Sequence, residues 1–155
     1  MTINCLVVGY GNSLRGDDGI GRKLAQTIAE WQLPGVRSLD LHQLTPELAA
    51  ELAQVALAIF IDAYSAKNND PVTFQVIKPS ASINLPSHFS SPQALLSLTQ
   101  TVYGHCPQAW WVMVPGVNFS LSDRFSPLAK QQSEQALREI ESLLESNTIT
   151  TVCTK

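Results

Sequence analysis

The chain has 155 residues, of which 45% are hydrophobic and 15% charged, and its formal net charge is −3. This length suffices for a sizeable core, so we expect a single domain over residues 1–155. A slightly acidic chain without a lysine or arginine cluster offers no electrostatic basis for nucleic-acid binding. No apolar run approaches the roughly 20 residues of a membrane helix, and the first residues lack a signal-peptide pattern. We therefore expect a cytoplasmic protein that has no membrane partner.

Apolar runs and helical spacing alternate along the chain. Strands are predicted at 3–8, 36–41, 55–61, 72–77 and 109–114, and helices begin near Ile20, Thr45, Ser91 and Ser126. Residues 55–61 are continuously apolar, as in a central strand that is buried on both faces. The next connection is too short for a helical crossover, so the fourth strand is predicted to run antiparallel to the third. Residues after Asn147 are expected to form a short strand or a frayed tail.

This order of elements predicts a three-layer α/β sandwich. The sheet would be mostly parallel and five-stranded, with one antiparallel strand and helices on both faces. If the second and third strands flank the first, the switch point lies between strands one and three. Ligands of such sheets bind beyond the carboxyl ends of the strands at this point.

The most informative segment is the glycine-rich turn at residues 9–21, which joins the first strand to the first helix and carries Asp17 and Asp18. The positive end of a helix dipole favours ionised carboxylates. Two carboxylates there would repel a phosphate, so the turn is better suited to a cation or to acid–base chemistry. One of the two, Asp17, could instead be a helix N-cap.

A dinucleotide site is a weaker alternative for the same turn. Gly9-x-Gly11 begins the relevant fingerprint, and Asp40 ends the next predicted strand, where a ribose-binding acid could lie. However, Leu14 occupies the position of the third glycine. The partial match and the neighbouring acids argue against a nucleotide.

Asp62 follows the apolar third strand. A carboxylate at the edge of such a core costs several kcal/mol unless something compensates it. It could cap the next turn through Ser65 or through backbone N–H groups, or it could meet Asp18 at the carboxyl rim of the sheet. Two carboxylates held close together need a shared proton or a cation, and this favours a functional site.

Three histidines could complete such a site. His88 lies in a long predicted loop, 78–91, and long loops in compact domains are usually functional. His42 follows the second strand at the same rim, and His105 follows the third helix. The residues alone leave the choice open.

The turn at 9–21 resembles the G-x-G-N-x-L-x-x-D-[DE]-G-x-G signature of the hydrogenase maturation endopeptidases, and the resemblance extends to 60–63, 88–92 and 110–127. It implies an endopeptidase that removes a C-terminal extension from the large-subunit precursor of a nickel–iron hydrogenase. It also implies that Asp18, Asp62 and His88 bind the metal and form the catalytic site. The triplet His42-Gln43-Leu44 resembles that of peptidases serving bidirectional, NAD-linked hydrogenases.

Two carboxylates and one imidazole suit nickel, zinc or another first-row divalent ion. Either the enzyme holds the ion and activates water with it, or the ion arrives in the substrate. The resemblance implies nickel carried by the substrate, for which other divalent ions could substitute in vitro. Asp18 or Asp62 could act as the base on water. A non-catalytic, metal-sensing chaperone for the precursor is the alternative function.

Overall fold

The computed structural model describes residues 3–67, 70–79 and 91–153, with only the backbone for 147–153. Its elements follow the predicted alternation, with one short 3-10 helix added in the glycine-rich turn. They are β1 (Cys5–Tyr10), the 3-10 helix η1 (Gly16–Gly19), α1 (Ile20–Glu30), β2 (Val36–Leu41), α2 (Leu48–Leu52), β3 (Leu57–Ser65), β4 (Thr73–Ile77), α3 (Pro92–Tyr103), β5 (Gln108–Gly116) and α4 (Pro127–Cys153).

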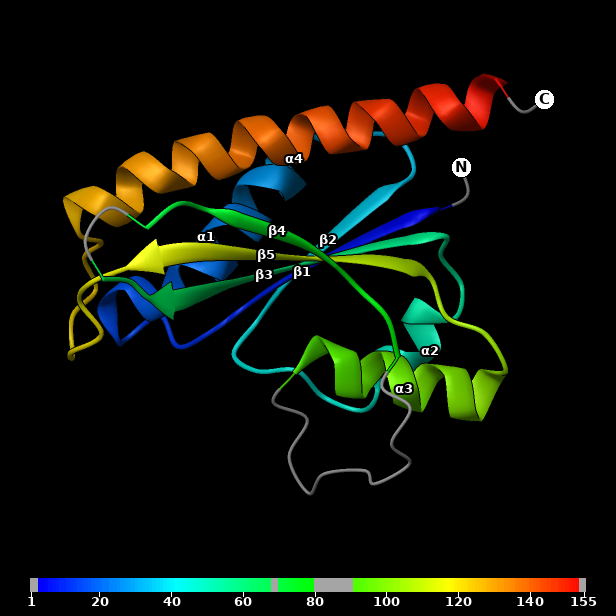
Figure 1. Ribbon diagram of the computed structural model, residues 1–155, viewed down its shortest axis with the longest axis horizontal. Coiled ribbons are helices and arrows are strands. Elements are labelled where there is room, and N and C mark those ends of the chain that lie inside the picture. Colours follow the sequence, from blue (N-terminus) through cyan, green and yellow to red (C-terminus); the bar gives the residue numbers. More distant parts are fainter. Residues whose placement is uncertain (1–2, 68–69, 80–90, 154–155) are drawn as a thin grey trace.

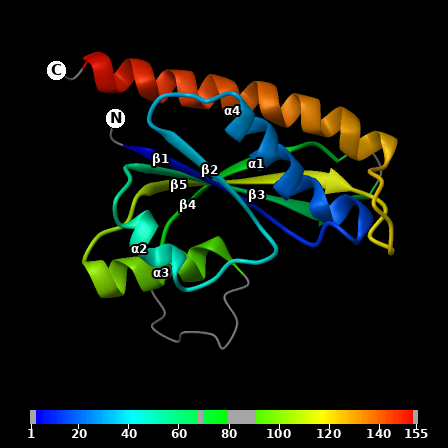
Figure 2. The same cartoon turned by 180° about the vertical axis from the view of Figure 1, so that it is seen from behind.

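The five strands form one sheet in the order β2-β1-β3-β5-β4, and only β4 is antiparallel to its neighbour. Helices α1 and α4 cover one face, and α2 and α3 cover the other (Figures 1 and 2). The predicted three-layer α/β sandwich is therefore confirmed. In the described residues no helix is long and apolar enough to cross a membrane.

Strand β4 runs antiparallel to β3, as predicted, but it does not pair with it. It pairs with β5 at the sheet edge, with Thr73 opposite Met113. Only Ile77 of β4 is buried, which fits an edge strand. Strand β5 buries Val112 and Val114 and takes the inner position beside β3.

Side chains of β3 alternate between the two layers of the core, as the pleat of a strand requires. Ile59 and Ile61 pack with α1 and α4, whereas Ala58 and Phe60 pack with α2 and α3. Asp62 is next in this alternation, so it belongs to the face covered by α2 and α3.

Several predicted boundaries were wrong. Helix α2 begins at Leu48 rather than near Thr45, because the Leu48 N–H bonds to the Thr45 carbonyl in a tighter turn that precedes the helix. Helix α4 continues to Cys153, where a strand or frayed tail was expected. The predicted start of α3 is confirmed, because the Ser91 hydroxyl accepts a hydrogen bond from the Ala94 N–H at 3.2 Å.

Candidate active site at the carboxyl rim of the sheet

Two glycines let the turn after β1 approach the sheet closely. Gly11 has a φ of +144°, and a Cβ there would lie 2.0 Å from the Asp18 carbonyl oxygen. A Cβ on Gly21 would lie 2.3 Å from the Ile61 carbonyl oxygen. Both approaches are closer than any real Cβ contact, so a side chain on Gly11 would push η1 away from the start of the turn, and one on Gly21 would push α1 away from β3. The glycines thus bring the acids of the turn to the carboxyl end of β3.

Asp17 is completely buried and holds a distant loop in place. Its carboxylate accepts hydrogen bonds from the N–H groups of Val117, Asn118 and Ser126 and from the Ser126 hydroxyl, at 2.7–3.0 Å. Burial raises the pKa of Asp17, but these four bonds outweigh burial and leave the pKa below its ordinary value. The Ser126 hydroxyl in turn accepts from Ala129 N–H at the start of α4. Asp17 is therefore a structural residue that supports the cap of α4 rather than that of its own helix.

Asp18 points to a different environment. It is partly buried, and its Oδ2 accepts a hydrogen bond from the Asn12 N–H at 2.8 Å. Within the described ranges its carboxylate has no other hydrogen bond. One oxygen of Asp18 is therefore open to a ligand.

Asp62 lies where β1 leaves the sheet, one residue beyond the last β1–β3 pair, Gly9 with Ile61. The prediction that it ends β3 was wrong, since the strand continues alongside β5 to Ser65. Among the described residues, its Oδ1 accepts a hydrogen bond only from its own neighbour, the Ala63 N–H, at 2.8 Å. The bond to Ser65 that the turn-cap alternative allowed is thus absent from the described part of the chain, whereas a bond to a backbone N–H group is present.

The two acids interact electrostatically. Burial raises the pKa of Asp62 to about 7, the negative charge of Asp18 adds to the increase, and the hydrogen bond from Ala63 N–H and the nearby Tyr10 hydroxyl oppose it. The turn that carries Asp18 therefore lies near enough to the carboxyl half of β3 for the charge of Asp18 to influence Asp62. An acid with a pKa near neutrality in such a place is typical of functional sites.

Two aromatic residues beside Asp62 were missed by the sequence analysis. Tyr10 is only 6% exposed, yet its hydroxyl forms no hydrogen bond of standard geometry in the described part of the chain, and neither does the buried Nε1 of Trp111. Both groups nonetheless lie close enough to influence one another, and the hydroxyl is also close enough to influence Asp62. The predicted first strand, 3–8, ended before Tyr10, whereas β1 continues to Tyr10 and so places it beside Asp62.

The histidines are separated by the fold. His88 lies outside the described residues. His42 is exposed beyond the carboxyl end of β2, whereas His105 is exposed before β5, at the opposite rim. In residues 3–67, 70–79 and 91–153, no three His, Cys, Asp or Glu side chains form a group that could hold a metal. The described residues thus supply two carboxylates but no third ligand.

The dinucleotide alternative finds no support in the position of Asp40. Its carboxylate forms an ion pair with Arg22 and a hydrogen bond with Gln26 Nε2, both at 3.1 Å. The hydrogen bond with Gln26 makes the largest contribution to lowering its pKa. Asp40 therefore joins β2 to α1.

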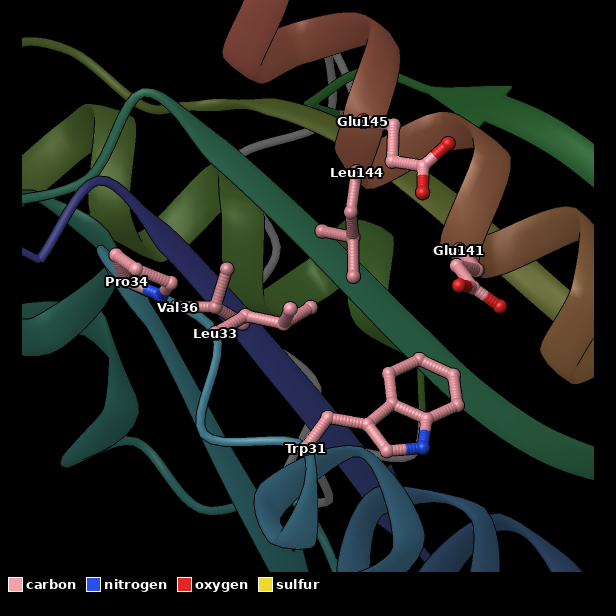
Figure 3. Close-up of a pocket in the computed structure, with 7 residues that line it drawn as sticks. All are labelled: Trp31, Leu33, Pro34, Val36, Glu141, Leu144 and Glu145. Carbon is pink, nitrogen blue, oxygen red and sulfur yellow. The ribbon is translucent and has the colours of Figure 1, made fainter.

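A separate cavity of about 630 Å³ lies at the other rim, between the end of α1, the start of β2 and α4 (Figure 3). Apolar side chains, among them Trp31, Leu33 and Leu144, surround it together with Glu141 and Glu145. None of the candidate site residues lines it.

No protein-family model matches the chain, and no match was found among curated protein sequences. Its fold is shared with solved structures of hydrogenase maturation proteases. The endopeptidase HybD from E. coli is 22% identical, with 93% of each chain covered and a TM-score of 0.71. The [NiFe] hydrogenase maturation protease HycI from Thermococcus kodakarensis KOD1 is 20% identical, with 92% of this chain and 93% of that chain covered and a TM-score of 0.71. An endopeptidase from Escherichia coli is 24% identical, with 93% of each covered and a TM-score of 0.67.

Proposed function

We propose that this chain is an endopeptidase that removes a C-terminal extension from the large-subunit precursor of a nickel–iron hydrogenase. The observation that carries the proposal is the electrostatic interaction of Asp18 with the half-buried Asp62, which lies just beyond the β1–β3 pairing at the switch point of the sheet. The shared fold with structures named as hydrogenase maturation proteases supports the same reaction class. Fold alone does not fix function, so the carboxylate pair is the decisive feature.

The donor set fits a divalent ion that arrives with the substrate. Asp18 and Asp62 each have one carboxylate oxygen without a hydrogen bond among the described residues. His88 would be the third ligand. A site with so few ligands binds free ions weakly compared with a closed structural site. Nickel already lodged in the precursor would supply the missing contacts, so recognition would depend on nickel insertion.

The same two acids suit the hydrolytic step. A bound divalent ion polarises the scissile carbonyl or a water molecule. A general base works best when its pKa lies near the working pH, and the pKa of about 7 for Asp62 meets this condition. In this proposal, either Asp62 or Asp18 accepts the proton of the attacking water, and the other carboxylate contacts the ion.

The loop after β2 is placed to help select the substrate. His42 and Gln43 are exposed near the carboxyl rim, whereas Leu44 is buried in the core. We propose that the two exposed side chains contact the precursor. The likeness of this triplet to that of peptidases for bidirectional, NAD-linked hydrogenases supports a substrate of that type.

A direct experiment separates the peptidase from the alternative chaperone. The purified chain is incubated with nickel-loaded precursor, and the intact mass of the precursor is followed alongside an Asp62→Asn control. A peptidase shortens the precursor, and the Asp62→Asn variant does not. Stable binding by the unaltered chain without any shortening would support the chaperone and refute the peptidase.

A further inference from the structure

Two buried polar atoms near Asp62 lack partners in the described part of the chain, namely the Tyr10 hydroxyl and the Trp111 Nε1. Leaving a buried donor without a hydrogen-bond partner destabilises the folded state. Most buried polar groups in native proteins have a partner, so an exception needs an explanation. That two of them lie beside the same carboxylate points to a shared role.

The sheet register places these donors on either side of Asp62. Tyr10 follows the Gly9–Ile61 pair, so it lies alongside Asp62 on the neighbouring strand β1. Trp111 pairs with Phe60, two residues before Asp62, on the other neighbour, β5. Tyr10 and Trp111 pack into the core layer of α2 and α3, the face to which Asp62 belongs by alternation.

Tyr10 is the group that interacts with both Trp111 and Asp62, and hydrogen-bonding chemistry fixes the direction of each of these two contacts when Asp62 is ionised. An indole N–H can only donate, a phenol can both donate and accept, and an ionised carboxylate can only accept. Trp111 Nε1–H must therefore donate to the Tyr10 oxygen, and the Tyr10 O–H must donate to Asp62. Since Asp62 Oδ1 already accepts from Ala63 N–H, Oδ2 is the oxygen without a partner.

We propose that Tyr10, supported by Trp111, is a positioning residue that donates a hydrogen bond to Asp62 and fixes the orientation of its carboxylate toward the ligand. The Tyr10 hydroxyl already lies within interaction range of both Trp111 and Asp62. The proposal rests on the proposed function for the identity of that ligand, a divalent ion.

The first test needs no metal. In a ¹H–¹⁵N NMR spectrum, the indole signal of Trp111 is the one missing from a Trp111→Phe variant. Tyr10→Phe, which keeps the ring that packs in the core, should shift this signal upfield, and Asp62→Asn should shift it through the shared hydroxyl. Tyr103→Phe is the matched control, since Tyr103 ends α3 at the opposite rim. An indole signal that stays in place in Tyr10→Phe would overturn the proposal.

The second test measures binding of nickel alone by calorimetry. Removing an outer hydrogen-bond partner of a metal ligand typically lowers affinity 10–100-fold, so Tyr10→Phe should raise Kd about 10–100-fold while Tyr103→Phe leaves it unchanged. Equal affinity of Tyr10→Phe and the unaltered chain would refute the positioning role. If the unaltered chain itself binds no free nickel, the proposed function stands, because its ion arrives with the substrate, and the NMR experiment alone decides whether Tyr10 holds Asp62.

Discussion

Asp17 and Asp18 are adjacent, yet their surroundings predict opposite consequences when each is changed to Asn. Asp17 is buried and accepts four hydrogen bonds, whereas Asp18 accepts one. The Asp17→Asn variant should therefore have a lower free energy of unfolding than the unaltered chain. Asp18→Asn should leave stability nearly intact but abolish processing of the precursor.

The size of the Asp17 effect follows from its bonds. An amide at this position keeps one oxygen and turns an NH2 toward the remaining donor, so one bond is lost and three become neutral. Bonds to charged groups contribute about 1.5–3 kcal/mol and neutral bonds about 1 kcal/mol, so we expect a loss of about 2–4 kcal/mol, with allowance for non-additivity. Asp18→Asn keeps its single bond from Asn12 and should cost less than about 1 kcal/mol.

Urea unfolding followed by circular dichroism measures both values, with exposed Asp123→Asn as the control. The control should stay within about 0.5 kcal/mol of the unaltered chain. Because the pKa of Asp17 is lowered in the folded state, its contribution is complete above the unfolded pKa of about 3.9 and disappears as the pH falls through the folded pKa. The effect of Asp17→Asn should thus shrink below about pH 4. A loss no greater than that of Asp123→Asn would refute the structural role of Asp17.

Three further predictions concern the site and its support. Because the folded pKa of Asp62 is about 7 and the unfolded value about 3.9, the free energy of unfolding falls as the pH rises between these two values. Asp62→Asn should remove this pH dependence and stop processing of the precursor. A variant that cleaves the precursor normally would contradict the catalytic role. Gly21→Ala places a Cβ 2.3 Å from a backbone oxygen of β3 and should lower stability by about 1–3 kcal/mol. Gly104→Ala is the control and should cost less, because no atom lies within 4 Å of its Cβ and only the φ of +81° is strained. Equal melting temperatures of the two variants would argue against close packing of the turn. His88→Ala should block processing while His105→Ala, at the opposite rim, should not, and the reverse result in a mass-spectrometric assay would reassign the third ligand.

The fold was predictable because its signals are local and repeated. The continuous apolar run of β3 and the glycine-rich turn after β1 fix the centre of the sheet and its switch point, where the charge of Asp18 influences Asp62. The partner of β4 was not predictable, since the short connection sets only its direction. β4 pairs with β5 rather than with β3 because β5, whose Val112 and Val114 are buried, takes the inner position beside β3.

The site was predictable only in part. The sequence allowed Asp17 to be a cap or a ligand, and only the loop 117–126, about a hundred residues away, shows that its carboxylate is fully used. Contacts over that separation leave no periodic pattern in the sequence. Tyr10 was overlooked because its ring looks like ordinary core packing, and its unpaired hydroxyl becomes evident only beside Trp111 and Asp62. The role of His88 stays a prediction.

The central claim is best tested by offering the chain two precursors that differ only in nickel. The chain is first stripped of metal with a chelator, which is then removed, and the intact mass of each precursor is followed over time. The proposed function predicts shortening of the nickel-loaded precursor and none of the nickel-free form. Prompt cleavage of the nickel-free precursor would contradict recognition through substrate-borne nickel, and rescue of an inactive reaction by added zinc would indicate an ordinary metallopeptidase.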